Sequence, residues 1–190
     1  MSEKIASKLL KLMSELDILT ILPRAGWHFA GIDKPESVSD HCYQTALLSL
    51  FIAESTDSSL DITKVLKLAL LHDAAESRLT DLPRRAVMYL GSSKTKAEAI
   101  INRDLFADIS LEVVSILDEF DNPHSLEAKI VVAAHDLQNL FKALMYANAG
   151  KGNLSEYITD ALNYNDRGIP LAREICDIIL RQLQAQNGQL

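Results

Sequence analysis

The segment Leu70-Leu71-His72-Asp73-Ala74-Ala75-Glu76 places three ligand-type side chains in an otherwise apolar stretch. In a helix, His72 and Glu76 would share one face because they are four residues apart. Burying an imidazole and two carboxylates together is costly unless something pairs them, and a divalent cation would do so. Imidazole and carboxylate ligands suit Mn, Fe, Co, Ni or Zn. The alternative is a hydrogen-bonded His72–Asp73 pair on a helix surface, which the dipeptide alone favours.

Two further histidines interrupt segments with a helical pattern. His41 follows Asp40 near the start of a predicted helix, where a lone histidine is usually a capping or core residue. His135 and Asp136 stand inside a run of apolar residues in another predicted helix. Three polar insertions on three predicted helices are harder to explain as unrelated core residues than any single one.

A loop rich in proline and glycine carries two candidate substrate-binding residues, Arg24 and Trp27. An arginine can bind a phosphate through two parallel hydrogen bonds. A tryptophan can stack on a base or pack against a sugar. The alternative is a surface arginine and a tryptophan that packs over helix ends, and for Trp27 taken alone this alternative is favoured.

The elements that must position these residues are predicted to be helices. Apolar residues recur at spacings of three and four, Ser37 or Ser39, Asp61 and Ser125 are candidate N-caps, and no segment shows strand alternation. The sequence therefore predicts one all-α domain over residues 1–190. The expected helices span residues 3–20, 38–53, 61–79, 84–107 with a break near Gly91, 111–120 and 125–149, followed by two helices within 154–187 that are separated near Gly168 and Pro170.

The overall charge limits the classes of partner that the chain can bind. A formal net charge of -7 over 190 residues disfavours non-specific binding to nucleic acid polymers and to anionic membranes. It leaves room for a small phosphate-bearing substrate, because a metal or local positive charge can override the global sign. Cys42 and Cys176 form no C-x-x-C pair, which argues against a thiolate zinc site or a disulfide framework. With no secretory signal or membrane-length apolar run, we expect a cytoplasmic protein.

The order of the motifs carries a family resemblance. The chain contains, in this order, Pro23-Arg24-Ala25-Gly26-Trp27, Pro35-Glu36-Ser37-Val38-Ser39-Asp40-His41, His72-Asp73-Ala74-Ala75-Glu76, Asp81-Leu82-Pro83 and Glu127-Ala128-Lys129. Over roughly residues 15–148 this succession resembles the HD-domain superfamily, and within it the branch of the 5′-deoxynucleotidases. The resemblance implies a helical bundle, with the motifs in a core of about residues 15–148 and the predicted C-terminal helices over 154–187 outside it.

The resemblance also implies an activity and roles for residues. It implies hydrolysis of deoxyribonucleoside 5′-monophosphates to nucleoside and phosphate, a divalent metal ion (Mn, Co, Ni, Fe, Zn or Mg) and a homodimer. By position, three residues match metal ligands, two match acidic residues of the active site, and two match the loop that contacts phosphate and sugar. These are His41, His72 and Asp73, then Glu76 and Asp81, then Arg24 and Trp27.

One position departs from the family pattern. The last metal ligand of the family is an aspartate in a pattern like Ala-Asp-x-Leu, whereas this chain has Ala134-His135-Asp136-Leu137. An ungapped alignment places His135 at the aspartate position. Because neighbouring helix positions point about 100° apart, His135 and Asp136 cannot replace it equally well. Either His135 binds the metal, which we favour, or a local shift brings in Asp136, or the site is weakened, with altered metal preference or lost activity.

Two other functions are compatible with these motifs. The first is an HD-type phosphohydrolase for a nucleoside triphosphate, a cyclic dinucleotide or an alarmone. Such larger anions call for additional basic residues, and Arg84 and Arg85 are the best candidates here. The second is a non-catalytic nucleotide-binding helical module, which the His135 departure leaves open.

Overall fold

The computed structural model describes residues 2–187, and these form helices and loops without a β-strand. The prediction of an all-α fold is confirmed. The helices are α1 (Ser2–Leu16), the 3₁₀ helix η1 (Asp17–Thr20), α2 (Gly26–Phe29), α3 (Val38–Thr56), α4 (Ile62–Leu71), α5 (Glu76–Leu79), α6 (Arg84–Leu90), α7 (Ser93–Phe106), α8 (Leu111–Leu117), α9 (Leu126–Asn148), α10 (Ser155–Leu162) and α11 (Pro170–Asn187).

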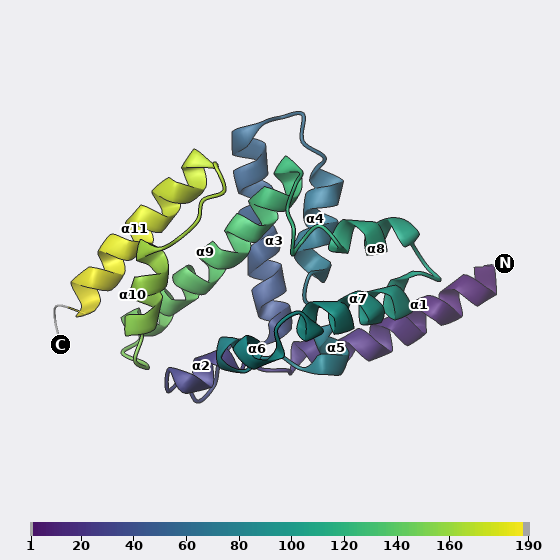
Figure 1. The fold of residues 1–190 in the computed structure, drawn as a ribbon, viewed down its shortest axis with the longest axis horizontal. Helices are drawn as coiled ribbons and strands as arrows, with labels where there is room; N and C mark the ends of the chain where they lie inside the picture. The colour runs from purple at the N-terminus through teal and green to yellow at the C-terminus, as the bar shows by residue number, and fades with distance from the viewer. Residues whose placement is uncertain (1, 188–190) are drawn as a thin grey trace.

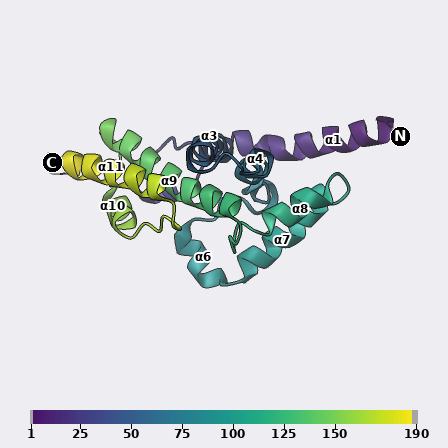
Figure 2. The ribbon, with the colours of Figure 1, turned by 90° about the horizontal axis from the view of Figure 1, so that it is seen from above.

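The centre of the fold is formed by α3, α4 and α9. Helix α3 packs against both α4 and α9, α11 lies along α9, α8 packs against α4, and α7 packs against α8 (Figure 1). The terminal helices α1 and α11 extend to opposite ends of the molecule (Figure 2). Buried apolar side chains such as Ile52, Leu68 and Leu137 join the three central helices in one continuous core. Three central helices therefore present their side chains to a shared interior.

Side-chain caps start the helices that carry the candidate site. Ser37 accepts a hydrogen bond from the Asp40 backbone, and Asp40 accepts one from the Ser37 backbone, which forms a capping box at the start of α3. The side chain of Asp61 caps α4 by accepting from Lys64 N–H, and that of Ser125 caps α9 by accepting from Ala128 N–H. Such caps typically contribute about 1 kcal/mol each. The predicted caps Asp61 and Ser125 are confirmed, and of the two candidates before α3 the structure uses Ser37.

The expected continuous helix over residues 61–79 is wrong. Helix α4 ends at Leu71, and α5 begins only at Glu76. In the turn between them the backbone bonds span three residues, as from Glu76 N–H to Asp73 O at 3.0 Å. The ring of His72 donates to the carbonyl of Ala69 at 2.9 Å. That oxygen is the one a continuing α-helix would bond to Asp73 N–H, so the His72 side chain helps to end the helix.

Smaller differences concern helix ends and the loop before α3. The first predicted helix closes as the 3₁₀ helix η1, and the helix expected over 111–120 ends at Leu117. The loop with Arg24 contains a short helix, α2, that the Pro/Gly content did not predict. This loop is folded back on itself, because Arg24 N–H donates to Glu36 O at 3.0 Å and Val38 N–H donates to Leu22 O at 2.9 Å. The backbone of Arg24 is thereby fixed beside the start of α3.

The turn after α9 holds the same loop from the other side. Asn153 N–H donates to Ala30 O at 2.7 Å. Gly152 has φ +76°, and a Cβ there would lie 2.7 Å from the Ala30 oxygen, so only glycine permits this approach.

Among the described residues, no helix is long and apolar enough to cross a membrane.

Candidate metal centre

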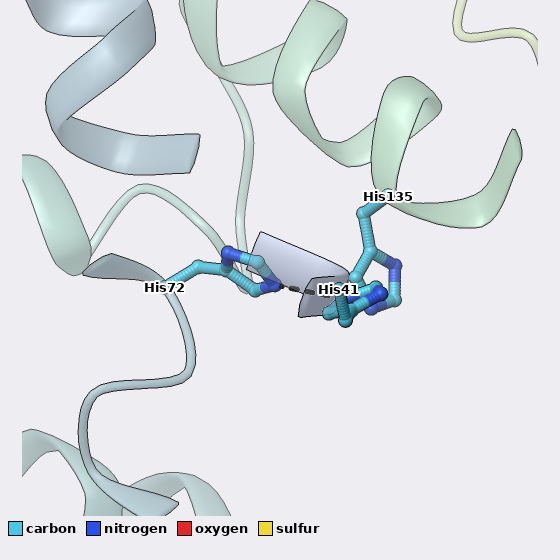
Figure 3. A group of neighbouring side chains, drawn as sticks. All are labelled: His41, His72 and His135. Atoms are coloured by element: carbon cyan, nitrogen blue, oxygen red, sulfur yellow. Dashed lines mark hydrogen bonds between the residues drawn. The ribbon is translucent and has the colours of Figure 1, made fainter. Parts of the chain in front are cut away.

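Three imidazole rings converge from three separate segments of the chain. His41 comes from α3, His72 from the turn after α4, and His135 from α9 (Figure 3). One ring nitrogen of each lies within 4.8 Å of the others. The Nε2 atoms of His41 and His72 are 3.2 Å apart. His41 is fully buried and His72 nearly so.

In two of these rings, His41 and His72, the Nδ1 nitrogen is hydrogen-bonded to a protein oxygen. Nδ1 of His72 faces the carbonyl of Ala69, which can only accept. Nδ1 of His41 lies 2.5 Å from Oε1 of Gln138, whose amide nitrogen donates to Glu36 Oε2 at 2.8 Å. Both rings therefore carry a hydrogen on Nδ1, and in its neutral form each ring presents the lone pair of Nε2 to the cluster. Burial, with the charge of Arg24, lowers the pKa of His41 well below its usual value, so this ring is neutral.

Asp73 adds a carboxylate oxygen to the same point. Its Oδ2 lies 3.3 Å from His72 Nε2 and 3.7 Å from His41 Nε2. Burial alone would raise the pKa of Asp73, but His72, Arg24 and His41 outweigh burial and hold it well below its usual range. The Cys42 sulfur also lies within 4.8 Å of a ring nitrogen of His72 and of an Asp73 oxygen. Burial raises the pKa of the Cys42 thiol well above its usual value, and the negative charge of Asp73 raises it further. Cys42 is therefore protonated.

These groups fit a divalent metal ion. Two imidazole Nε2 atoms and a carboxylate oxygen converge in the interior. Arg24 donates to the carboxylate oxygen, and a cation bound among the three atoms would stabilise all of them. A tetrahedral ion with metal–nitrogen bonds of about 2.0–2.1 Å separates two ligand nitrogens by about 3.3 Å. The observed 3.2 Å between His41 Nε2 and His72 Nε2 matches that separation. The donor set is of the kind that binds borderline transition metals.

His135 and its neighbour Asp136 are placed differently. His135 belongs to the imidazole cluster, whereas Asp136 does not belong to any metal-capable group among the described residues. Oδ1 of Asp136 lies 3.1 Å from His135 Nδ1, and its Oδ2 lies 3.6 Å from an Arg167 nitrogen. Burial lowers the pKa of His135, although the hydrogen bond to Asp136 opposes this effect.

A second layer of polar residues supports the cluster, and the sequence motifs assigned it no role. Gln138 joins His41 to Glu36, and Glu36 accepts from the indole nitrogen of Trp27 at 3.1 Å. Lys142 lies 3.4 Å from the other oxygen of Glu36. Burial raises the pKa of Glu36, although Lys142 opposes this shift. The available signal was a polar stripe on α9, because His135, Gln138 and Lys142 are spaced three and four residues apart in an apolar helix.

Arg24 lies between two carboxylates. Its guanidinium is 3.2 Å from Asp73 Oδ2 and 3.1 Å from Asp81 Oδ1, and it also donates to Asn139 at 3.4 Å. Asp81 further accepts from the backbone N–H of Ala25. Both oxygens of Asp81 are thus engaged in holding the Arg24 loop. The structure therefore places Arg24 and Asp81, both predicted site residues, beside the imidazole cluster.

Glu76 is a buried carboxyl group, 4% exposed. Its Oε2 has no hydrogen-bond partner among the described residues. Burial, together with the charges of Asp73 and Asp81, raises the pKa of Glu76 to about 10. The raised pKa means that the group carries a proton at neutral pH.

A cavity of about 420 Å³ adjoins the cluster. Ligand pockets typically have volumes of about 300–1,000 Å³. His135 and Arg24 line the cavity and connect it with the cluster, and Asp136 also lines it. Trp27, only 2% exposed, forms part of its wall and stacks on Tyr157 with ring centroids 4.5 Å apart. Other residues that line it are Phe29, Asp81, Arg84, Arg85, Asn139, Glu156, Asp160, Asn163 and Tyr164.

A helical bundle with a histidine and aspartate cluster of this kind defines the class of protein. The family model for the HD domain matches residues 16–171, and the chain therefore belongs to the HD-domain family. The family resemblance in the motifs is confirmed.

Particular relatives carry a common name. The chain is 32% identical over 154 residues to the 5′-deoxynucleotidase HDDC2 of Danio rerio, covering 78% of this chain and 76% of that protein. It is 29% identical over 164 residues to the 5′-deoxynucleotidase hdd1 of Schizosaccharomyces pombe, covering 80% and 81%. A conserved hypothetical protein from Pyrococcus furiosus shares the fold with a TM-score of 0.80 and 32% identity, covering 90% of this chain and 99% of that one.

Proposed function

We propose that the chain is a metal-dependent hydrolase that cleaves deoxyribonucleoside 5′-monophosphates into deoxynucleoside and phosphate. The observation that carries this proposal is the convergence of three imidazoles and the Asp73 carboxylate beside a cavity that Arg24 enters. The relatives named 5′-deoxynucleotidase support the choice of substrate class.

The metal ligands would be His41, His72, Asp73 and His135. The alternative ligand Asp136 is less favoured, because its carboxylate faces His135 Nδ1 and Arg167 rather than the cluster. Imidazole-rich sites favour Mn, Fe, Co, Ni or Zn over Mg, which prefers oxygen ligands. A divalent ion bound here supplies a Lewis acid for the phosphoryl oxygens and lowers the pKa of a bound water.

Arg24 is the residue that would bind the phosphate. Its guanidinium is held by Asp73 and Asp81 at the boundary between the cluster and the cavity. An arginine fixed in this way can bind phosphate oxygens without losing side-chain freedom at the moment of binding. Its charge would offset the charge that develops on the phosphoryl group.

Glu76 is better suited than Asp81 to transfer a proton. Both oxygens of Asp81 are engaged, by Arg24 and by the Ala25 backbone, so Asp81 positions the phosphate-binding loop. Glu76 retains a buried oxygen without a partner and a pKa raised by burial and by its acidic neighbours. A buried carboxyl group that keeps its proton at neutral pH can donate it as a general acid.

Trp27 would form the wall beside the sugar. Its ring is held on one side by Tyr157 and at its nitrogen by Glu36, so its position is fixed. A rigid wall at the sugar rejects an additional hydroxyl by steric exclusion, which would favour a 2′-deoxyribose.

A larger nucleotide substrate is less favoured by the charges around the cavity. Arg84 and Arg85 both line it, but Arg84 is 2.9 Å from Asp160, and the guanidinium of Arg85 lies over the ring of Phe29. Glu156 and Asp160 also line the cavity and add negative charge. A triphosphate or a dinucleotide would meet these carboxylates.

Phosphate release from a panel of deoxyribonucleoside and ribonucleoside 5′-monophosphates tests the proposal. The protein is first chelated and then resupplied with Mn²⁺, Co²⁺, Ni²⁺, Zn²⁺ or Mg²⁺ in turn. His72→Ala is the disabling variant, and His124→Ala is its matched control, because His124 is an exposed histidine outside the cluster. Nucleoside triphosphates and cyclic dinucleotides in the same panel test the alternative substrates.

We expect metal-dependent release from the deoxynucleotides, little from ribonucleotides, loss in His72→Ala and retention in His124→Ala. If phosphate is released only from another class of nucleotide, the proposed substrate is wrong and that class is the substrate. Metal binding without any phosphate release would favour a non-catalytic nucleotide-binding module.

The homodimer, the cytoplasmic location and the assignment of residues 1–190 to one domain stay predictions. Tyr43, Leu47 and Phe51 leave an apolar strip exposed on α3, and this strip supports the homodimer. Light scattering on the full chain and on Phe51→Glu tests it. A dimer that Phe51→Glu converts to a monomer is the expected result, and a monomeric unaltered chain would contradict it.

A further inference from the structure

Asp136 is bonded to the ring of its own neighbour. His135 and Asp136 are adjacent on α9, and His135 Nδ1 lies 3.1 Å from Asp136 Oδ1. A carboxylate can only accept in this bond, so Nδ1 of His135 is the protonated nitrogen. The lone pair of the ring is then on Nε2, as in His41 and His72.

The other oxygen of Asp136 faces Arg167, which lies in the loop between α10 and α11. The distance from Asp136 Oδ2 to a guanidinium nitrogen of Arg167 is 3.6 Å. Arg167 has φ +55°, a conformation that non-glycine residues rarely adopt. A residue keeps such an unfavourable backbone conformation only when contacts with its surroundings hold it there.

The loop around Arg167 is tied to α9 at a second point. The hydroxyl of Tyr164 donates to the carbonyl of Ala133 at 3.1 Å, two residues before His135. Within the loop, Arg167 N–H donates to Asn165 and Gly168 N–H donates to Asp166. These bonds fix the backbone from which Arg167 reaches Asp136.

We propose that Asp136 is a positioning residue that sets the tautomer and orientation of His135 for metal binding, and that Arg167 holds Asp136 in turn. The inference rests on the metal centre proposed above. Metal-binding histidines commonly donate their second N–H to a carboxylate, which fixes the ring and increases its strength as a ligand. Here the histidine that stands where the family has an aspartate brings its own carboxylate partner from the next position.

The arrangement also distinguishes this role from direct metal binding. Asp136 has 39% of its side chain exposed, against 21% for His135. Both of its oxygens have partners away from the cluster, and only His135 belongs to the group that could hold an ion. The carboxylate therefore acts on the ion through the imidazole.

Co²⁺ is the probe for this inference, because its visible absorption reports the number and type of its ligands. The full-length chelated protein is titrated with Co²⁺ alone, and the affinity is measured by competition with a chelator. The variants are Asp136→Ala, Asp136→Asn, Arg167→Gln and, as the ligand-loss reference, His135→Ala. Glu174→Gln is the control, since Glu174 is an exposed acidic residue on α11. Circular dichroism verifies that each variant is folded, and Asp136→Asn preserves side-chain volume.

We expect Asp136→Ala to weaken Co²⁺ binding by about 10- to 100-fold while the shape of the absorption spectrum is retained. Asp136→Asn and Arg167→Gln should lie between Asp136→Ala and the unaltered protein, and only His135→Ala should change the spectrum. Unchanged affinity in Asp136→Ala would overturn the inference, as would the same spectral change in Asp136→Ala and His135→Ala. If the unaltered protein binds no Co²⁺, the metal centre fails, and this inference fails with it. That result is distinguishable from the other two.

Discussion

The Nε2 atoms of His41 and His72 face each other at 3.2 Å, with the Nδ1 of each ring bonded to a protein oxygen. When both rings are neutral, neither can donate to the other in these tautomers, and their two Nε2 lone pairs oppose each other in the protein interior. A metal ion bound between the rings would relieve that repulsion.

Metal binding should therefore stabilise the folded protein. Added Zn²⁺, Co²⁺ or Mn²⁺ should raise the midpoint of thermal unfolding of chelated protein. The expected gain is about 2.7 kcal/mol at a free metal concentration of roughly 100 times Kd. His41→Ala should abolish the shift and His124→Ala should retain it, as measured by differential scanning calorimetry. Equal shifts in both variants would place the bound ion outside the cluster.

Glu76 should make the metal-free protein less stable as pH rises. Its pKa is about 10 in the folded state, against 4.5 for the ordinary group. Between these values the folded state binds a proton that the unfolded chain lacks, so the free energy of unfolding falls with increasing pH. The limit for one proton is about 1.4 kcal/mol per pH unit.

Urea unfolding in chelator, from about pH 6 to about pH 9, measures this slope. Glu76→Gln cannot ionise and should flatten it, whereas Glu174→Gln on the surface should leave it unchanged. The assignment is contradicted if Glu76→Gln and the unaltered chain show the same pH dependence.

Gln138 should control how tightly the metal binds. It is completely buried, accepts the Nδ1 hydrogen of His41 and donates to Glu36. Gln138→Leu removes the group that fixes the His41 tautomer, and we expect metal affinity to fall about 10- to 100-fold. The unfolding free energy should also fall by about 1–3 kcal/mol, because Glu36 loses a partner. Chelator competition measures the affinity, with exposed Gln182→Leu as control, and an unchanged affinity in Gln138→Leu would disprove the role.

Trp27 should report and shape nucleotide binding. It is the single tryptophan of the chain, and it lines the cavity while stacked on Tyr157. Its fluorescence should change when a deoxynucleotide is added to chelated protein. Trp27→Phe loses the bond to Glu36 and should raise KM more than it lowers kcat. Trp27→Ala should cost about 3–5 kcal/mol of stability. A change in kcat alone for Trp27→Phe would exclude Trp27 from sugar binding.

Local sequence signals predicted most of the helices because those signals act within a few residues. The caps Asp61 and Ser125 bond to backbone groups three positions away, and the break near Gly91 separates α6 from α7. The end of α4 at Leu71 was missed because the His72 ring takes the Ala69 carbonyl once it has been placed in the interior. Helical periodicity carries no information about such side-chain competition.

The residues of the cluster could be predicted from the order of the motifs, whereas the hydrogen bonds of Gln138 and Glu36 that hold His41 in place could not. His41, His72 and Asp73, the residues that match family ligands, lie together, and His135, which stands where the family has an aspartate, lies with the other two histidines. The bond between Gln138 and Glu36 joins residues 102 positions apart and depends on how the Arg24 loop packs against α9. Sequence spacing within one helix marks Gln138 as polar, but it does not name its partner.

The path from His41 through Gln138 and Glu36 to Trp27 joins the metal centre to the cavity wall by three hydrogen bonds. Any free energy of coupling transmitted along it is reciprocal by thermodynamic necessity. A nucleotide whose binding is improved tenfold by the ion must improve the binding of the ion tenfold. Cells poor in the metal would then load the enzyme most fully when its substrate is abundant.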